Sequence, residues 1–109
     1  MTEIELDAVF LALASTPRRR MLDVVRLAPG CTVNYLSDHF DMSRVGVLKN
    51  LNVLEAAGLV TSEKHGRERL LFINPVPLQL IHERWSDTYA SFWANRLTRL
   101  KYAVEKMED

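Results

Sequence analysis

The sequence has little cysteine, no long apolar run and no net charge. Its single cysteine, Cys31, cannot form an intrachain disulfide, which fits a reducing compartment. The longest apolar run, from Ala8 to Ala14, is far shorter than the roughly 20 residues that span a bilayer. Fourteen Lys and Arg residues balance fourteen Asp and Glu residues, so the chain as a whole attracts neither nucleic acid nor an acidic membrane. We therefore expect one small cytoplasmic domain, residues 1–109, that does not act at a membrane.

Motifs for catalysis and metal binding are also missing. The sequence has no glycine-rich phosphate loop, no nucleophile motif and no paired carboxylates. Its three histidines, His39, His65 and His82, do not combine with the one cysteine at the spacing of a zinc site. We therefore expect that the protein is not an enzyme and binds no cofactor or metal. The histidines are expected to be solvated or hydrogen-bonded at the surface.

Charge is distributed unevenly along the chain. Residues 1–14 carry three acids and no base, and residues 75–109 carry five of each. Residues 15–74 carry nine bases and six acids, a net charge of +3. Any attraction to nucleic acid must come from this middle segment.

Hydrophobic spacing predicts four helices, a hairpin and a long last helix. Thr16-Pro17, Thr32 and Ser43 are suited to begin the second, third and fourth helices, and Gly58 is suited to end the fourth. A glycine in the short connection His65-Gly66-Arg67 allows the chain to reverse between two strands. The predicted elements are helices at Ile4–Ala14, about 17–28, Thr32–Phe40 and Ser43–Gly58, strands at Leu59–Lys64 and Glu68–Ile73, and a helix from Leu78. The predicted fold class is mainly α with a small β-hairpin.

The third and fourth predicted helices form a tight helix–turn–helix. Each has an apolar stripe at helical spacing, and only about three residues join them. The stripes are Val33, Leu36 and Phe40 on the third helix and Val47, Leu51 and Leu54 on the fourth, and the first helix has a stripe of Ile4, Ala8 and Leu11.

The outward face of the fourth helix is predicted to contact DNA. A major groove admits one α-helix, and Arg, Lys and Asn side chains reach base edges or phosphates from it. Lys64, Arg67 and Arg69 lie at or beside the hairpin tip, where a wing could contact the neighbouring backbone. A protein-binding module is the alternative function for such a fold. The exposed basic side chains of Arg44, Lys49 and Arg67 favour DNA binding. The predicted contact residues on the helix are Ser43, Arg44, Val45, Gly46, Lys49 and Asn50.

Three features have two interpretations each. Gly46 costs about 0.5–1 kcal/mol relative to alanine within a helix, and either permits close approach to the groove or is simply tolerated. Arg18-Arg19-Arg20 point in different directions around a helix, so structural pairing is favoured over phosphate contact. For Cys31, the role of a small buried hydrophobe is favoured over that of a redox sensor.

The last segment, 75–109, is predicted to be a dimerisation helix that follows a DNA-binding core, 1–74. Two prolines in Asn74-Pro75-Val76-Pro77 mark the boundary between them. Apolar residues then recur every three or four positions, over more length than so small a body can cover. A membrane-surface helix competes with this interpretation, but the segment lacks the necessary basic excess. The predicted dimer interface is Phe10, Trp85, Tyr89, Phe92, Trp93, Leu97 and Leu100, while Ile81 lies on the same stripe without an assigned role.

These motifs resemble those of the ArsR family of winged helix–turn–helix transcriptional regulators. The resemblance is carried by Ala12–Leu22, by Thr32–Leu36 and most specifically by Met42–Val60. It implies a homodimer that represses transcription from a two-fold operator in double-stranded DNA, with the fourth helix as the recognition helix. The aromatic residues from Trp85 to Leu97 resemble the subgroup often encoded beside a START-type partner protein.

The chain departs from the metal-sensing members of that family. Many of them bind metals through two cysteines on the third helix, or through His and carboxylate ligands on the last. Here the third helix offers only Asp38 and His39, and the last offers His82-Glu83 and Asp87 without a second histidine. The resemblance therefore implies a regulator that does not sense metals, with a metal-responsive sensor as the minor alternative. The sequence identifies neither the operator nor a small-molecule effector.

Overall fold

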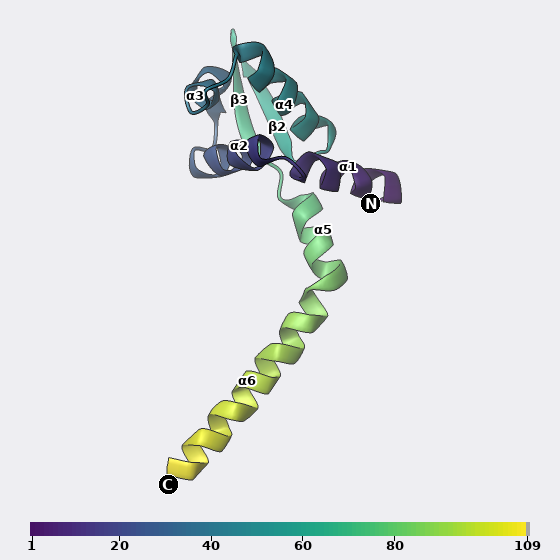
Figure 1. Cartoon of the computed structure of the whole chain (residues 1–109), viewed down its shortest axis with the longest axis vertical. Helices are drawn as coiled ribbons and strands as arrows, with labels where there is room; N and C mark the ends of the chain where they lie inside the picture. Colours follow the sequence, from purple (N-terminus) through teal and green to yellow (C-terminus); the bar gives the residue numbers. More distant parts are fainter. Residues whose placement is uncertain (109) are drawn as a thin grey trace. The chain divides into compact units, whose positions relative to one another are not determined.

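The computed structural model describes residues 1–108, apart from the side chains of Asp87 and Glu108, and forms two units that divide after Pro77 (Figure 1). Its elements are α1 (Glu3–Leu13), α2 (Thr16–Leu27), β1 (Cys31–Thr32), α3 (Val33–Ser37), α4 (Arg44–Ala56), β2 (Val60–His65), β3 (Glu68–Ile73), α5 (Val76–Trp85) and α6 (Asp87–Glu108). The predicted fold class is confirmed. None of the helices in residues 1–108 is both long enough and apolar enough to cross a bilayer.

Short polar side chains begin the first two helices. The Thr2 hydroxyl accepts a hydrogen bond from the Glu5 amide at 3.1 Å and caps α1. The cap of α2 is Ser15 rather than the expected Thr16, because Ser15 has the extended backbone that a cap requires. Its hydroxyl accepts from the Arg18 amide at 3.4 Å. Thr16 and the following proline thus form the first turn of the helix.

The buried face of α1 differs from the prediction. Leu6, Val9 and Ala12 point into the core, whereas Ile4 is 82% exposed and Leu11 is 68% exposed. The prediction of a stripe through Ile4, Ala8 and Leu11 is therefore wrong. Because α1 is apolar on most of its surface, spacing alone could not select the face that packs.

The helix–turn–helix consists of α3 and α4. The Thr32 hydroxyl accepts from the Tyr35 amide at 3.1 Å and caps α3, as predicted. The helix ends at Ser37 instead of Phe40, because the chain then tightens into a turn in which the amides of His39 and Phe40 bond three residues back. The connection to α4 thus spans residues 38–43 and is longer than expected. The predicted stripes are buried at Val33, Leu36, Val47, Leu51 and Leu54, and Phe40 is half-buried.

A three-stranded antiparallel sheet carries the hairpin. Val60 pairs with Ile73 and His65 pairs with Glu68, so β2 and β3 are joined by a two-residue turn. The first turn residue, Gly66, has φ +62°, which a glycine adopts without strain. The sheet order is β1-β3-β2. Sequence patterning missed β1, because a strand of two residues has too few positions to show alternation.

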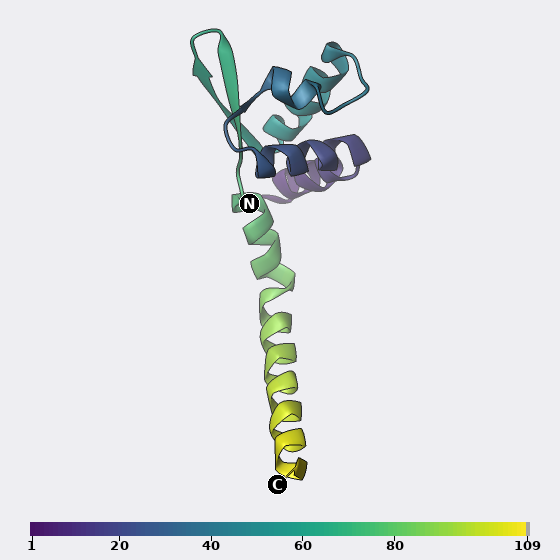
Figure 2. The ribbon, with the colours of Figure 1, turned by 90° about the vertical axis from the view of Figure 1, so that its left-hand side faces the viewer.

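The first unit has one apolar core, to which α1, α2, α3, α4 and the sheet all contribute. The tip of the hairpin and the first turn of α4 lie at the same end of this unit, away from α1 (Figures 1 and 2). A hairpin and a helix that face the same way define a two-part surface. The buried apolar residues are Leu6, Val9, Ala12, Met21, Val25, Val33, Leu36, Val47, Leu51, Leu54, Leu59, Val60 and Leu71.

The second unit consists of most of α5 and the 22-residue α6. The two helices meet at Ser86, where helical hydrogen bonds continue in both directions. The Ser86 amide donates to the His82 carbonyl at 2.8 Å, and the Ala90 amide donates to the Ser86 carbonyl at 2.7 Å. The long C-terminal helix predicted from the apolar spacing is therefore present, with α5 before it.

Candidate nucleic-acid interface

The exposed face of α4 lies opposite its buried stripe. Val45 is 74% exposed, and Lys49 and Asn52 are exposed on the same face. These positions are four and three residues apart, which places them on one side of the helix. Asn52 was missed from the sequence, although the same spacing could have identified it. Ser43 is exposed, but its hydroxyl accepts from the Gly46 amide at 3.1 Å and caps the helix as predicted.

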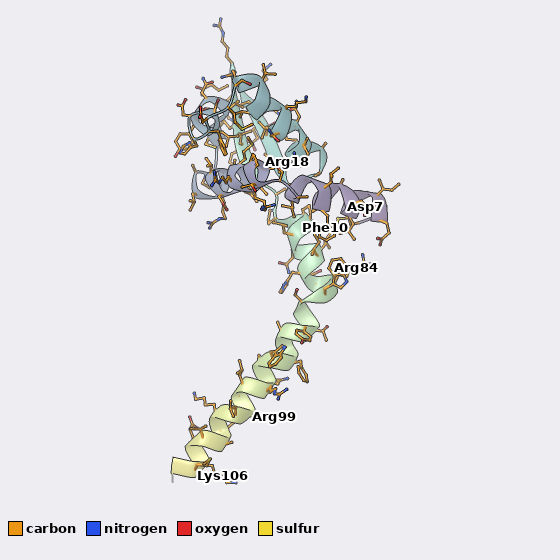
Figure 3. All side chains as sticks on the ribbon, viewed as in Figure 1. Asp7, Phe10, Arg18, Arg84, Arg99 and Lys106 are labelled. Carbon is orange, nitrogen blue, oxygen red and sulfur yellow. The ribbon has the colours of Figure 1, made fainter. Side chains whose placement is uncertain are left out.

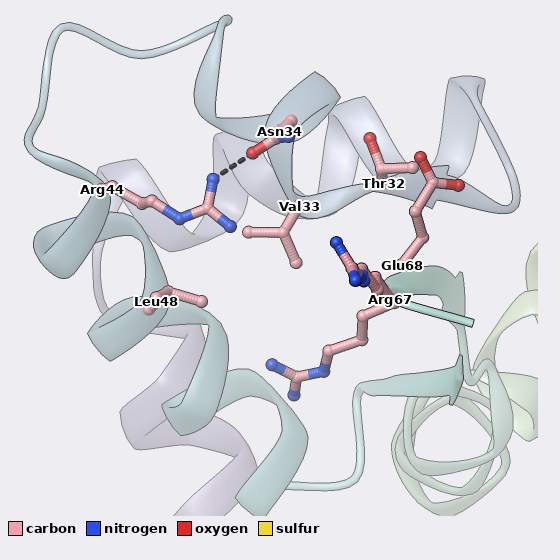
Figure 4. A pocket seen from close by; sticks show the side chains of 8 residues that line it. Thr32, Val33, Asn34, Arg44, Leu48, Arg67 and Glu68 are labelled. Carbon is pink, nitrogen blue, oxygen red and sulfur yellow. Dashed lines mark hydrogen bonds between the residues drawn. The ribbon is translucent and has the colours of Figure 1, made fainter. Parts of the chain in front are cut away.

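Arg44 stands at the start of α4, beside a pocket between the helix–turn–helix and the hairpin. Its Nη1 donates a hydrogen bond to Oδ1 of Asn34 in α3, which orients the guanidinium (Figure 4). The pocket has a volume of about 260 Å³. It brings Arg44 of α4 together with Arg67 of the hairpin. The lining residues are Thr32, Val33, Asn34, Arg44, Leu48, Arg67, Glu68 and Arg69.

The basic residues of the hairpin fall into two groups. Lys64 and Arg67 are exposed at the tip. Arg69 is half-buried, forms an ion pair with Glu55 of α4, and donates from Nε to the Ser62 hydroxyl at 3.1 Å. The structure therefore corrects the prediction for Arg69, because its guanidinium connects the sheet to α4 instead of facing outward.

Asn50 also differs from the prediction. It is half-buried between α2 and α4, and its Oδ1 accepts from Arg18 Nη1 at 3.2 Å. Its Nδ2 donates to the Gly46 carbonyl at 2.9 Å. Both polar atoms of the side chain are therefore engaged within the protein, so Asn50 does not belong to the outward face of α4.

Gly46 lies close to the side chains of two preceding residues, Met42 and Ser43. A Cβ at this position would lie 3.3 Å from Ser43 Oγ and 3.4 Å from Met42 Cε. The first contact requires the Ser43 hydroxyl to move by a few tenths of an ångström, and the second is an ordinary van der Waals contact. The Ser43 hydroxyl that caps α4 is therefore the group that a side chain at position 46 would press against.

The arginines of α2 pair with the end of α1, as the sequence favoured. Arg18 Nε donates to the Ala12 carbonyl at 2.8 Å, and Arg19 Nη1 donates to the Leu13 carbonyl at 2.7 Å. These carbonyls lie in the last turn of α1, where no helical amide follows to bond them. Arg20, which points elsewhere, is exposed.

Potential redox and metal ligands are sparse around this surface. Cys31 is half-buried in β1, and this burial raises the pKa of its thiol, which favours the unreactive protonated form. Within the described residues, no group of three His, Cys, Asp or Glu side chains is placed to hold a metal ion.

The second unit exposes an aromatic cluster. The rings of Tyr89 and Trp93 have centroids 6.1 Å apart, and Phe92 lies 6.1 Å from Trp93. Arg96 lies over the Trp93 ring at 5.4 Å. Most of the predicted interface is thus on one helix in this unit, whereas Phe10 belongs to the first unit and is 43% exposed there. The exposed predicted interface residues of the second unit are Trp85, Tyr89, Phe92, Trp93, Leu97 and Leu100.

The helix–turn–helix with its basic hairpin defines a winged helix–turn–helix protein, and comparison with known sequences agrees. The profile of the MarR family matches residues 15–68. The uncharacterized HTH-type transcriptional regulator YuzN of Bacillus subtilis (strain 168) is 38% identical, with 74% of this chain and 95% of that protein covered. The chain therefore belongs to the winged helix–turn–helix transcriptional regulators.

Solved structures show the same fold. A crystal structure of an ArsR family transcriptional regulator matches with a TM-score of 0.71 and 30% identity, covering 86% of this chain and 95% of that one. The homodimeric winged helix–turn–helix DNA-binding domain Mb0332 from Mycobacterium bovis, a possible ArsR-family regulator, matches with a TM-score of 0.62 and 20% identity. That match covers 90% of this chain and 83% of the other.

Proposed function

We propose that the protein is an ArsR-type repressor that binds a two-fold operator in double-stranded DNA as a homodimer in the cytoplasm. The observation that carries this proposal is the shared direction of two basic elements. The first turn of α4 and the hairpin tip lie at the same end of the first unit (Figure 2), Arg44 and Arg67 line one pocket between them, and Lys49 is exposed on α4. A recognition helix in the major groove and a wing on the adjacent backbone need this arrangement.

The proposed DNA contacts follow from exposure. Val45, Lys49 and Asn52 face the groove, Arg44 reaches a base edge or phosphate from the start of the helix, and the hairpin tip contacts the backbone through Lys64 and Arg67. Asn50 and Arg69 are left out because both are half-buried with their polar groups engaged within the protein, whereas Arg44 is exposed beside its bond to Asn34.

The proposed dimer contact is the exposed aromatic stripe of the second unit and, in the first unit, Phe10 of α1. Large aromatic side chains in contact with water are favourable to bury against a second copy. Each copy would then occupy a half-site, with the half-sites about one helical turn apart on the DNA. The same aromatic residues carry the resemblance to the subgroup encoded beside START-type proteins, to which we assign the chain within this proposal.

Selection of bound fragments from genomic DNA with the purified protein tests the proposal and returns the operator. We then expect Lys49→Ala to weaken operator binding by about tenfold and to lower the salt slope by about one, because one phosphate or base contact is lost. Lys106→Ala, which removes an exposed lysine at the end of α6, is the matched control and keeps the affinity of the parent.

Failure to enrich any DNA would contradict the proposal. Unchanged binding in both Lys49→Ala and Arg44→Ala would also contradict it and would favour the protein-interaction alternative.

A further inference from the structure

A continuous series of hydrogen bonds connects the end of α1 to the first turn of α4. Arg18 donates from Nη2 to the Leu11 carbonyl at 3.0 Å and from Nε to the Ala12 carbonyl at 2.8 Å. Its remaining nitrogen, Nη1, donates to Asn50, which in turn donates to the Gly46 carbonyl. Arg18 is labelled in Figure 3, where it lies close to the end of α1.

The chemistry of each group suits its place in this series. A guanidinium presents its donors in a rigid plane, so fixing two of them on α1 also fixes the direction of the third. The Asn50 amide has a donor on one side, Arg18, and an acceptor on the other, the Gly46 carbonyl, so its orientation is determined by its partners. Its two bonds therefore transmit the position of α1 to the backbone of α4.

The end of the series lies within the proposed recognition surface. Gly46 stands between Arg44 and Lys49, and a glycine loosens the first turn of a helix because its backbone is less restricted. A bond to the Gly46 carbonyl restrains that turn from the side that faces α2.

We propose that Asn50 and Arg18 are positioning residues that set the first turn of α4 for DNA recognition without touching DNA. This inference rests on the proposed function. It assigns to the junction of α1 and α2, distant from the hairpin tip, a part in operator affinity.

The test is a double-mutant cycle on the operator, with Asn50→Ala, Arg18→Lys and the combination. We expect each single variant to lower operator affinity about three- to tenfold, which is the value of one hydrogen bond. The operator affinity of the double variant should be no lower than that of the weaker-binding single variant, because both substitutions interrupt the same series of hydrogen bonds. Asn95→Ala on α6 and Arg20→Lys on α2 are matched controls that replace exposed residues of the same types.

Binding to non-specific DNA separates positioning from loss of folded protein. A misplaced first turn lowers operator affinity but leaves non-specific affinity unchanged, since that depends on charge. Partial unfolding lowers both by the same factor. Equal loss on both DNAs, or additive losses in the cycle, would overturn the inference, and additivity would instead indicate that Asn50 contacts DNA itself.

Amide hydrogen exchange without DNA distinguishes failure of the inference from failure of the proposed function. Arg18→Lys should increase amide exchange in residues 44–50 and at the end of α1, where Arg18 also donates hydrogen bonds, while α3 keeps its exchange rates. Unchanged exchange there would overturn the series, whether or not the parent binds an operator. If the parent protein binds no operator but Arg18→Lys still increases amide exchange in residues 44–50, the proposed function is overturned and the series of hydrogen bonds is not.

Discussion

Arg67 and Arg69 show how two identical residues on one hairpin acquire different roles. They are two positions apart, yet Arg67 is exposed at the tip while Arg69 pairs with Glu55. The other carboxylate oxygen of Glu55, Oε1, is buried without a hydrogen-bond partner among the described residues. Arg69 is therefore the main compensation for a carboxylate held away from water.

Alanine at each of these two positions should give opposite phenotypes. Arg69→Ala leaves Glu55 unpaired, so we expect the free energy of unfolding to fall by about 1–3 kcal/mol in urea titrations. Arg67→Ala should change stability by no more than about 0.5 kcal/mol and weaken DNA binding in a salt-dependent manner. A variant of Arg67 that is as destabilised as that of Arg69 would contradict this division.

Local signals at the ends of elements were predictable from the sequence, and packing choices were not. Thr32, Ser43 and Gly58 mark helix ends through short-range chemistry that a sequence displays directly. By contrast, the orientation of Asn50 depends on Arg18, which lies 32 residues earlier in the chain. The buried face of α1 likewise depends on neighbours that periodicity does not identify.

The C-terminal helix offers a prediction at the scale of an element. Leu97 is 61% exposed and lies on the aromatic side of α6, whereas Tyr102 is 66% exposed and lies about 140° around the helix. Leu97→Lys should convert the proposed dimer to a monomer in sedimentation, because a charge would be buried at the contact. Operator affinity should fall with it, since a single half-site is bound weakly.

Tyr102→Lys is the matched control for that experiment and should remain dimeric. Dissociation of both variants to the same extent would show that added charge, and not the aromatic side, is responsible. A Leu97→Lys protein that stays dimeric would place the interface elsewhere.

At the scale of the whole molecule, the number and arrangement of potential metal ligands predict that metal ions do not change DNA binding. An effector changes DNA affinity only if it binds the free and DNA-bound states of the protein differently. Among the described residues, no cluster of three His, Cys, Asp or Glu side chains is placed to bind a metal ion. We expect Zn²⁺, Cd²⁺ and arsenite each to change operator affinity less than about twofold in titrations followed by fluorescence anisotropy. A tenfold change that a chelator reverses would contradict this expectation.

Both tryptophans of the chain, Trp85 and Trp93, occur after Pro77, so the first unit contains none. Indole emission therefore comes from the C-terminal helices. Association of two chains through the aromatic stripe would shift that emission to shorter wavelength as the indoles leave water. The chain thus carries its own fluorescent probe of assembly, and circular dichroism on the same sample follows folding of the whole chain.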